Sequence, residues 1–270
     1  MTDNDDEPVG RILSRREALK LLGAASAALL VGCGTEQETA VPTTAPTTVP
    51  LTAATAVPAT NTPLATLVSG STAVPVCVAR PELTEGPYFV DTGLNRADIR
   101  SDPATGVVKD GALLTLIFNV SQINNGCTPL PGALVDVWHC DALGVYSDVT
   151  DRTFDTTGQQ FLRGYQVTDA NGVAQFTTIY PGWYPGRAVH IHFKIRTRPD
   201  SARGYEFTSQ LFFEEALNDQ IHAQAPYASK GRRNTLNSTD RIFNEQLVVT
   251  AVPDGDGYTA TFDVGLDLSG

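Results

Sequence analysis

The sequence has 270 residues, of which 41% are hydrophobic and 18% charged, and its formal net charge is −11. The hydrophobic content is ordinary for a globular protein, and the length allows one large domain or two small ones. The acidic balance argues against nucleic acid or an anionic membrane surface as a partner, because both require basic patches.

The N-terminus reads as an export signal. Residues 14–20 are SRREALK, a twin-arginine signature, and the apolar run 21–31 that follows is too short to span a bilayer as a mature helix. The run ends in LVGC, which resembles a bacterial lipobox whose cysteine, Cys33, is lipidated. We therefore expect residues 1–33 to export the protein and anchor it by lipid at the extracytoplasmic face of the cell envelope. The alternative is an amphipathic helix with a chance arginine pair.

Residues 34–75 are rich in Thr, Ala, Pro and Val and hold almost no charge after Glu38. Such a composition cannot build a core, so we predict an extended, disordered tether between the membrane and a folded domain at 76–270. Outside the cytoplasm a disulfide is permitted, and Cys77 and Cys127 both lie in turn-like contexts, so we pair them. Cys140 lies within a strand-like run and is interpreted as a buried free thiol.

The domain shows short extended segments separated by turns. We predict a helix only at 214–223, and strands at 114–120, 133–140, 161–167, 173–179, 189–195, 206–213, 246–251 and 258–268. A Pro-Asp-Gly-Asp-Gly turn joins the last two strands into a hairpin. This pattern predicts an all-β fold, an antiparallel β-sandwich with long loops and little helix.

The stretch 180–194 reads YPGWYPGRAVHIHFK and concentrates donor side chains. On a strand, alternation points His190 and His192 to one face, and Tyr184 and Arg187 lie just upstream. A metal site needs such a cluster of nitrogen and oxygen donors. We therefore predict half of a metal site here, the alternative being two core histidines.

Tyr146 is a further candidate ligand, because like Tyr184 it follows a glycine-containing turn that can aim a side chain inward. Each could also be an ordinary core tyrosine. Two phenolates with two neutral imidazoles match a trivalent cation, and phenolate favours Fe(III), whereas zinc more often takes Cys, His and carboxylate. Of the other histidines, His139 is interpreted as a hydrogen-bonded core residue and His222 as a solvated one.

Two polar residues could serve the same pocket. Arg187, three residues before His190, can place a permanent positive charge beside a bound anion. Gln210 offers an amide, although spacing alone does not bring it to the pocket.

Three motifs carry a family resemblance: GPY at 86–88, PGALVDVWHCDALGVYS at 131–147, and TDANGVAQFTTIYPGWYPGRAVHIHF at 168–193. In order and spacing they resemble the intradiol ring-cleavage dioxygenases, the group that holds catechol 1,2-dioxygenase and protocatechuate 3,4-dioxygenase. The resemblance covers residues 81–213. It implies four ferric ligands: Tyr146, Tyr184, His190 and His192. It also implies that Arg187 and Gln210 steady the activated substrate beside the catalytic Tyr184, and that Tyr88 lines the substrate pocket.

The resemblance further implies an Fe(III) enzyme of aromatic catabolism that cleaves a diphenol with O2 between its two hydroxyl carbons, giving a muconate-type dicarboxylate. Only Pro185 and Gly186 separate Tyr184 from Arg187, where relatives carry a longer insertion, so we expect a more open pocket. Two alternatives remain open: a non-catalytic surface β-sandwich that binds a partner, and a zinc- or copper-binding periplasmic protein.

Overall fold

The structure is a computed structural model that describes residues 77–197 and 205–268. The predicted export signal with its lipidated Cys33 (1–33) and the predicted tether (34–75) lie outside the described residues, and both stay predictions. Within the part that is described, no helix is long and apolar enough to cross a membrane.

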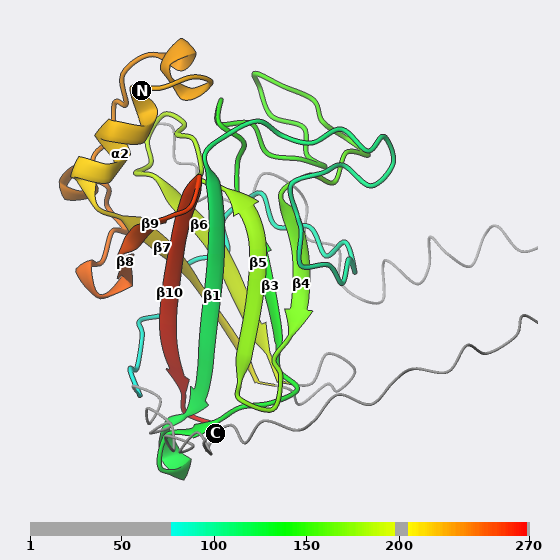
Figure 1. The fold of residues 1–270 in the computed structure, drawn as a ribbon, viewed down its shortest axis with the longest axis vertical. Coiled ribbons are helices and arrows are strands. Elements are labelled where there is room, and N and C mark those ends of the chain that lie inside the picture. The colour runs from blue at the N-terminus through cyan, green and yellow to red at the C-terminus, as the bar shows by residue number, and fades with distance from the viewer. Residues whose placement is uncertain (1–76, 198–204, 269–270) are drawn as a thin grey trace, which may run out of the picture. The chain divides into compact units, whose positions relative to one another are not determined.

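Two five-stranded sheets make up the fold (Figure 1). The first holds β1 (Leu113–Gln122), β2 (Thr128–Pro129), β5 (Val173–Ile179), β9 (Ala251–Asp254) and β10 (Gly257–Leu266). The second runs in the order β4 (Arg163–Val167), β3 (Leu134–Trp138), β6 (His190–Arg196), β7 (Glu206–Phe213), β8 (Val248–Val249). Helix α2 (Glu215–His222) follows β7, and short 3-10 helices cover Ile123–Asn125, Tyr227–Lys230, Asn237–Thr239 and Glu245–Leu247. The predicted β-sandwich with little helix is confirmed.

Most strand pairs are antiparallel, as predicted, but two are parallel. β1 pairs with β10 in parallel, and β7 pairs with β8 in parallel. β1 therefore lies between β10 and β5, next to the last strand of the domain (Figure 1). Strand periodicity is the same in both orientations, so the sequence could not show which pairs run parallel.

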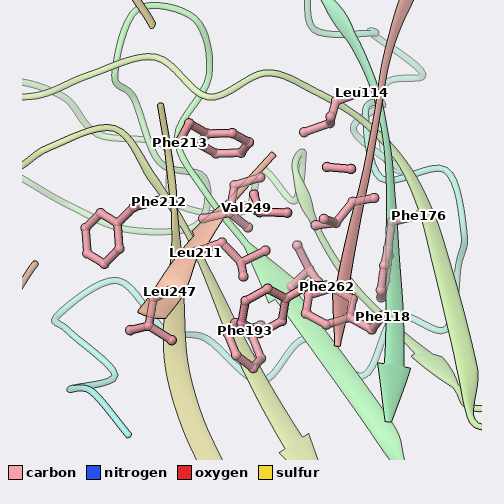
Figure 2. Packing of buried hydrophobic residues seen from close by; sticks show 14 of the residues in the cluster. Leu114, Phe118, Phe176, Phe193, Leu211, Phe212, Phe213, Leu247, Val249 and Phe262 are labelled. Atoms are coloured by element: carbon pink, nitrogen blue, oxygen red, sulfur yellow. The ribbon is translucent and has the colours of Figure 1, made fainter. Parts of the chain in front are cut away.

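The core fills the space between the sheets. On β1 the apolar face predicted from alternation is buried, at Leu114, Leu116, Phe118 and Val120. The Phe118 ring lies 5.2 Å from the Phe193 ring of β6 and 6.2 Å from the Phe262 ring of β10, centroid to centroid (Figure 2). Burying each such ring contributes about 1.5–3 kcal/mol, so these contacts fix β6 firmly against the first sheet.

The predicted helix at 214–223 is confirmed as α2, whereas the predicted strand at 246–251 is wrong in its bounds. Glu245–Leu247 forms a 3-10 turn that begins where the Asn244 side chain accepts a hydrogen bond from the Gln246 amide. Val248–Val249 then pairs with β7, and only Ala251–Asp254 forms the hairpin with β10. The side-chain cap favours the turn at the start of the predicted strand, so extended structure begins only at Val248.

A disulfide joins Cys77 to Cys127, the pairing that the sequence predicts, and closes a loop across 50 residues. Cys140 is buried and is the free cysteine of the described residues, as expected. Burial raises the pKa of its thiol to about 12, so it stays protonated and packs as a small apolar side chain.

Candidate metal centre

Strand β6 carries two histidines on its outer face. Ile191 and Phe193 point into the core, and the alternation turns His190 and His192 to the opposite side, where loops cover them so that each is at most 2% exposed. Their Nε2 atoms lie 3.0 Å apart. Trp138 of β3 pairs with His192 across the sheet and stacks on its ring at 5.0 Å, which holds the imidazole in place.

Two loops bring phenol groups to the same point. Tyr146, on the loop between β3 and β4, places Oη 3.4 Å from His190 Nε2, and Tyr184, on the loop before β6, places Oη 3.2 Å from it. Ligands bound at about 2.0–2.1 Å to a common metal ion lie about 2.9–3.6 Å apart at angles between 90° and 120°. The three separations fall within this range, so the four predicted ligands lie together.

The hydrogen-bonding capacity of the four groups fits a cation at their centre. His190 Nδ1 lies 2.7 Å from the Ala188 carbonyl oxygen, which can only accept, so Nδ1 carries the proton and Nε2 presents a lone pair. The His192 Nδ1 atom is buried without a hydrogen-bond partner. If His192 is protonated there, two lone pairs face each other at 3.0 Å, and if it is protonated at Nε2, Nδ1 is left unsatisfied. A metal ion removes the conflict because it binds both lone pairs.

The electrostatics of the cluster favour neutral imidazoles. Burial lowers the pKa of both histidines well below the ordinary value, and the nearby Arg187 lowers it further. Burial also raises the pKa of Tyr146 well above its ordinary value, and Tyr184 adds to the effect. A phenol in this position ionises only when a cation lies beside it, which is the chemistry of a metal-bound tyrosinate. Among the described residues no group of three or more His, Cys, Asp or Glu gathers into a metal site.

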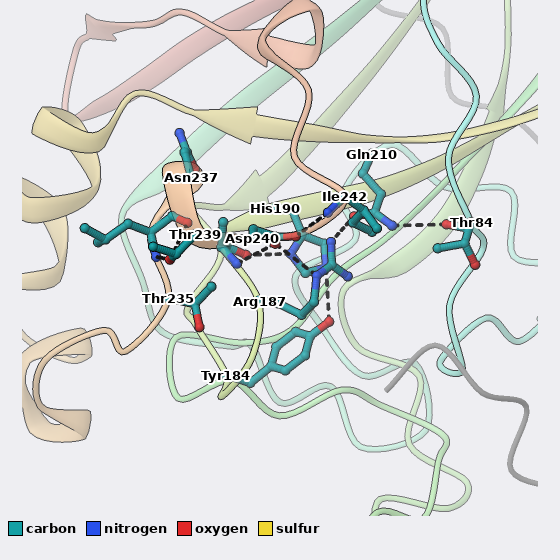
Figure 3. Close-up of polar contacts among 12 residues, drawn as sticks. Thr84, Tyr184, Arg187, His190, Gln210, Thr235, Asn237, Thr239, Asp240 and Ile242 are labelled. Atoms are coloured by element: carbon teal, nitrogen blue, oxygen red, sulfur yellow. Dashed lines mark hydrogen bonds and ion pairs between the residues drawn. The ribbon is translucent and has the colours of Figure 1, made fainter. Parts of the chain in front are cut away.

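Arg187 lies beside this cluster in a fixed orientation (Figure 3). Its Nε donates to Asp240 Oδ2 at 3.0 Å, and one NH2 group donates to Gln210 Oε1 at 2.6 Å. Gln210 in turn donates to the Thr84 carbonyl at 3.0 Å. Burial acts to lower the pKa of Arg187, but Tyr184 and Asp240 raise it above its ordinary value. The guanidinium is therefore buried, charged and held from two sides.

Close backbone contact positions the two tyrosine loops. The Gly182 amide donates to the Asp141 carbonyl at 3.2 Å, and a Cβ on Gly182 would lie 2.6 Å from the Ala142 carbonyl oxygen. Only glycine permits this approach, which joins the loop of Tyr184 to the loop of Tyr146. The Tyr146 carbonyl also accepts a 2.7 Å hydrogen bond from the Thr156 hydroxyl, and this fixes the second loop.

Tyr88 packs against the cluster from the segment before β1. Its ring stacks on Tyr146 at 4.5 Å and meets Tyr184 edge-on at 6.0 Å. Its hydroxyl donates to Asp151 Oδ2 at 2.8 Å. Tyr88, Tyr184 and Asp151 line a cavity of about 350 Å³, whereas Tyr146 is fully buried behind it. Tyr184 therefore faces both the cavity and the two histidines.

Sequence reasoning missed two carboxylates of the site, Asp240 and Asp151. Each lies in a loop segment with no motif around it, and Asp240 reaches Arg187 across 53 residues of chain. The interpretation of His139 as a hydrogen-bonded core residue agrees with its 2.7 Å contact to Thr178 Oγ1. The interpretation of His222 as solvated is wrong: it is 8% exposed, because its ring stacks on Tyr227 and its Nε2 lies 3.1 Å from the Pro181 carbonyl oxygen.

The comparison with known families decides the identity of the domain. The dioxygenase family Dioxygenase_C matches residues 84–267, a segment that includes both sheets and the whole cluster. The chain belongs to this family. A solved structure of an intradiol ring-cleavage dioxygenase from Tetranychus urticae is 29% identical and superposes with a TM-score of 0.63, covering 72% of this chain and 97% of that one.

Other relatives of this dioxygenase family member are more partial. Catechol 1,2-dioxygenase 1 of Acinetobacter lwoffii is 29% identical over 160 residues, which cover 50% of this chain and 46% of that protein. Protocatechuate 3,4-dioxygenase beta chain of Burkholderia cepacia is 33% identical over 155 residues, which cover 52% and 65% respectively. The matched segments thus span about half to two thirds of these curated relatives.

Proposed function

We propose that the protein is a non-haem Fe(III) dioxygenase that cleaves a catechol-type ring between its two hydroxyl-bearing carbons with O2, giving a muconate-type dicarboxylate. One observation carries the proposal. Two phenol oxygens and two imidazole nitrogens converge at separations of 3.0–3.4 Å around His190 Nε2, beside a buried guanidinium. Membership of the dioxygenase family and the similarity to intradiol enzymes support the same reaction class.

The four candidate ligands would bind the metal through Tyr146 Oη, Tyr184 Oη, His190 Nε2 and His192 Nε2. Ferric iron held there would supply Lewis-acid chemistry, which draws electron density from a diphenolate and makes its ring reactive toward O2. The two phenolates would hold iron in the ferric state, because hard anionic oxygen donors favour it. Zinc or copper would find a poorer match in this donor set.

Tyr184 is placed to exchange a proton with the substrate. It lines the cavity, whereas Tyr146 is 1% exposed and covered by Tyr88. A diphenol that enters the cavity must lose both hydroxyl protons to bind as a dianion, and Tyr184 Oη is the tyrosine oxygen of the cluster next to that space. We therefore assign Tyr184 as the acceptor of one of these protons, with the other released to solvent in the cavity, and Tyr146 as a permanent ligand.

Arg187 supplies positive charge where negative charge develops on the ring during cleavage. Because its guanidinium is already fixed by Asp240 and Gln210, it need not reorganise when the charge appears, which is the condition for efficient electrostatic stabilisation. Gln210 acts here through Arg187, since its side-chain oxygen accepts from the guanidinium and its nitrogen donates to Thr84. Tyr88 would line the substrate pocket by its place in the cavity wall.

We also propose that the protein is exported. The twin-arginine signature of residues 14–20 and Cys33 after an apolar run support a lipid-anchored protein at the extracytoplasmic face of the envelope. Twin-arginine export carries folded proteins, which suits a domain that receives its metal in the cytoplasm.

The test is oxygen uptake by the iron-loaded protein with a panel of diphenols. We expect uptake with at least one 1,2-diphenol, a dicarboxylic product containing both oxygen atoms of 18O2, and loss of activity in Tyr184→Phe. Absence of uptake with every diphenol would favour the binding-module alternative. Cleavage outside the two hydroxyl carbons, seen by mass spectrometry, would contradict the intradiol assignment.

A further inference from the structure

The cavity beside Tyr184 is larger than a simple diphenol requires. A space of about 150 Å³ is enough to hold a benzene ring, and this cavity measures about 350 Å³. Leu143, Gly144 and Lys230 form part of the cavity wall, together with Tyr184. A ring bound at the tyrosines would therefore leave room for a substituent that extends toward this wall.

The charged residues of the cavity are unusual for so acidic a chain. Three charged side chains line it: Asp151, Arg152 and Lys230, which sum to one positive charge, although the chain as a whole carries −11. Asp151 is already engaged by the Tyr88 hydroxyl at 2.8 Å. The local field at the mouth of the cavity therefore favours an anion, while the rest of the chain repels one.

Lys230 is held in position at the wall. Its ammonium donates a hydrogen bond to the Leu143 carbonyl and lies 5.0 Å above the Trp183 ring. An ammonium has three donors, and one of them is used in this bond. No carboxylate of the described residues lies within ion-pair distance of Lys230, whereas Lys109 pairs with Asp141 and Lys194 pairs with Glu85 and Glu206. The group is half-buried, so solvent screens its charge only in part.

Gly144 provides the space for the ammonium. Its backbone is left-handed, with φ at +80°, and a Cβ built there would collide with Lys230 Nζ and with the Trp183 carbonyl. A residue with a side chain at this position would expel the ammonium from the cavity wall. The turn at 141–144 thus contacts the 3-10 helix Tyr227–Lys230 through the ammonium of Lys230, which donates to the Leu143 carbonyl.

From this we infer that Lys230 selects the substrate, and that the preferred diphenol carries an anionic substituent, a carboxylate, that pairs with its ammonium. This inference rests on the proposed function, because it names the substrate class of the same site. The carboxylate would accept from the ammonium donors that Leu143 leaves available, in a partly desolvated position where a charge-assisted hydrogen bond is strong.

The experiment compares 3,4-dihydroxybenzoate with its methyl ester, which has the same diphenol and no charge. Calorimetry gives Kd for each compound and oxygen uptake gives kcat/KM, both on the iron-loaded full chain. The wild-type protein should prefer the acid, and Lys230→Met should lower the acid-to-ester ratio about tenfold, the effect of one charge-assisted hydrogen bond. The exposed Arg232, two residues along, provides the control: Arg232→Met removes the same charge and should change the ratio less than about twofold.

A wild-type protein with no preference for the acid would overturn the inference. An acid-to-ester ratio that Lys230→Met leaves unchanged would overturn it as well. Lys230→Gln, which can still donate to Leu143, repeats the measurement should the methionine variant fold poorly. Absence of oxygen uptake in the wild-type protein would refute the proposed function alone, because the ratio of Kd values still decides whether Lys230 recognises the carboxylate.

Discussion

Replacing Asp240 with asparagine should destabilise the protein strongly, because Asp240 is the buried counter-charge of Arg187. One carboxylate oxygen accepts from Arg187 Nε at 3.0 Å and from the Ala188 amide at 2.8 Å, and the other accepts from the Ile242 amide at 3.0 Å. The side chains of the pair are 7% and 1% exposed. Removing one partner of a buried ion pair typically costs 3–5 kcal/mol, and asparagine keeps one neutral acceptor, so we expect a loss of about 3 kcal/mol.

The matched control is Asp98→Asn. Asp98 also accepts from an arginine and a backbone amide, both of Arg100, but the side chains of this pair are 32% and 50% exposed. An exposed pair contributes about 0–1 kcal/mol. Denaturant unfolding followed by circular dichroism gives both free energies, and thermal melting should show a decrease of about 6–12 °C for the Asp240 variant. Equal losses in the two variants would refute the assignment of Asp240 as the residue that holds the buried Arg187 charge.

Three further predictions concern stability and the metal. Burial lowers the pKa of His139 to about 4, so as the pH falls this histidine is protonated in the unfolded chain before it is protonated in the folded protein. Between about pH 6.5 and 4 the free energy of unfolding of the wild-type protein should therefore fall by about 3 kcal/mol more than that of His139→Gln, and parallel pH profiles of the two proteins would disprove this. Replacing Cys77 and Cys127 together with serine opens a loop across 50 residues and should cost about 4 kcal/mol in urea unfolding, whereas a loss below about 1 kcal/mol would show that the disulfide adds little. Tyr184→Phe should shift the visible absorption band of the iron-loaded protein, and an unaltered band would contradict Tyr184 as a ligand. His190→Ala should lower the iron content, and an unaltered iron content would contradict His190 as a ligand.

The strands of the fold could be predicted where one face is buried and the other is not. The alternation of Leu114, Leu116 and Phe118 on β1 and the period-two run of β10 follow directly from burial against the second sheet. The parallel pairing of β1 with β10 could not be predicted, because it depends on which segments meet in space. The start of the strand predicted at 246–251 was wrong for a local reason, because the Asn244 side chain caps a 3-10 turn at Glu245–Leu247.

The candidate site, like the fold, could be predicted from the sequence only in part. His190 and His192 could be placed together because strand alternation determines their direction, and their Nε2 atoms indeed lie 3.0 Å apart. Asp240 and Asp151 could not be predicted, since each joins the site through a loop whose path no periodicity specifies. His222 was misjudged because the buried face of α2 is itself largely polar, with Asn218 and His222 beside Ile221, so polarity did not reveal which side chains are buried.

The central claim is that Tyr146, Tyr184, His190 and His192 bind one ferric ion. The most direct measurement is the metal content of the purified protein together with its visible spectrum. We predict one iron per chain and a red-brown colour from tyrosinate-to-iron charge transfer. A colourless protein that binds zinc, or one that takes up no iron, would contradict the claim.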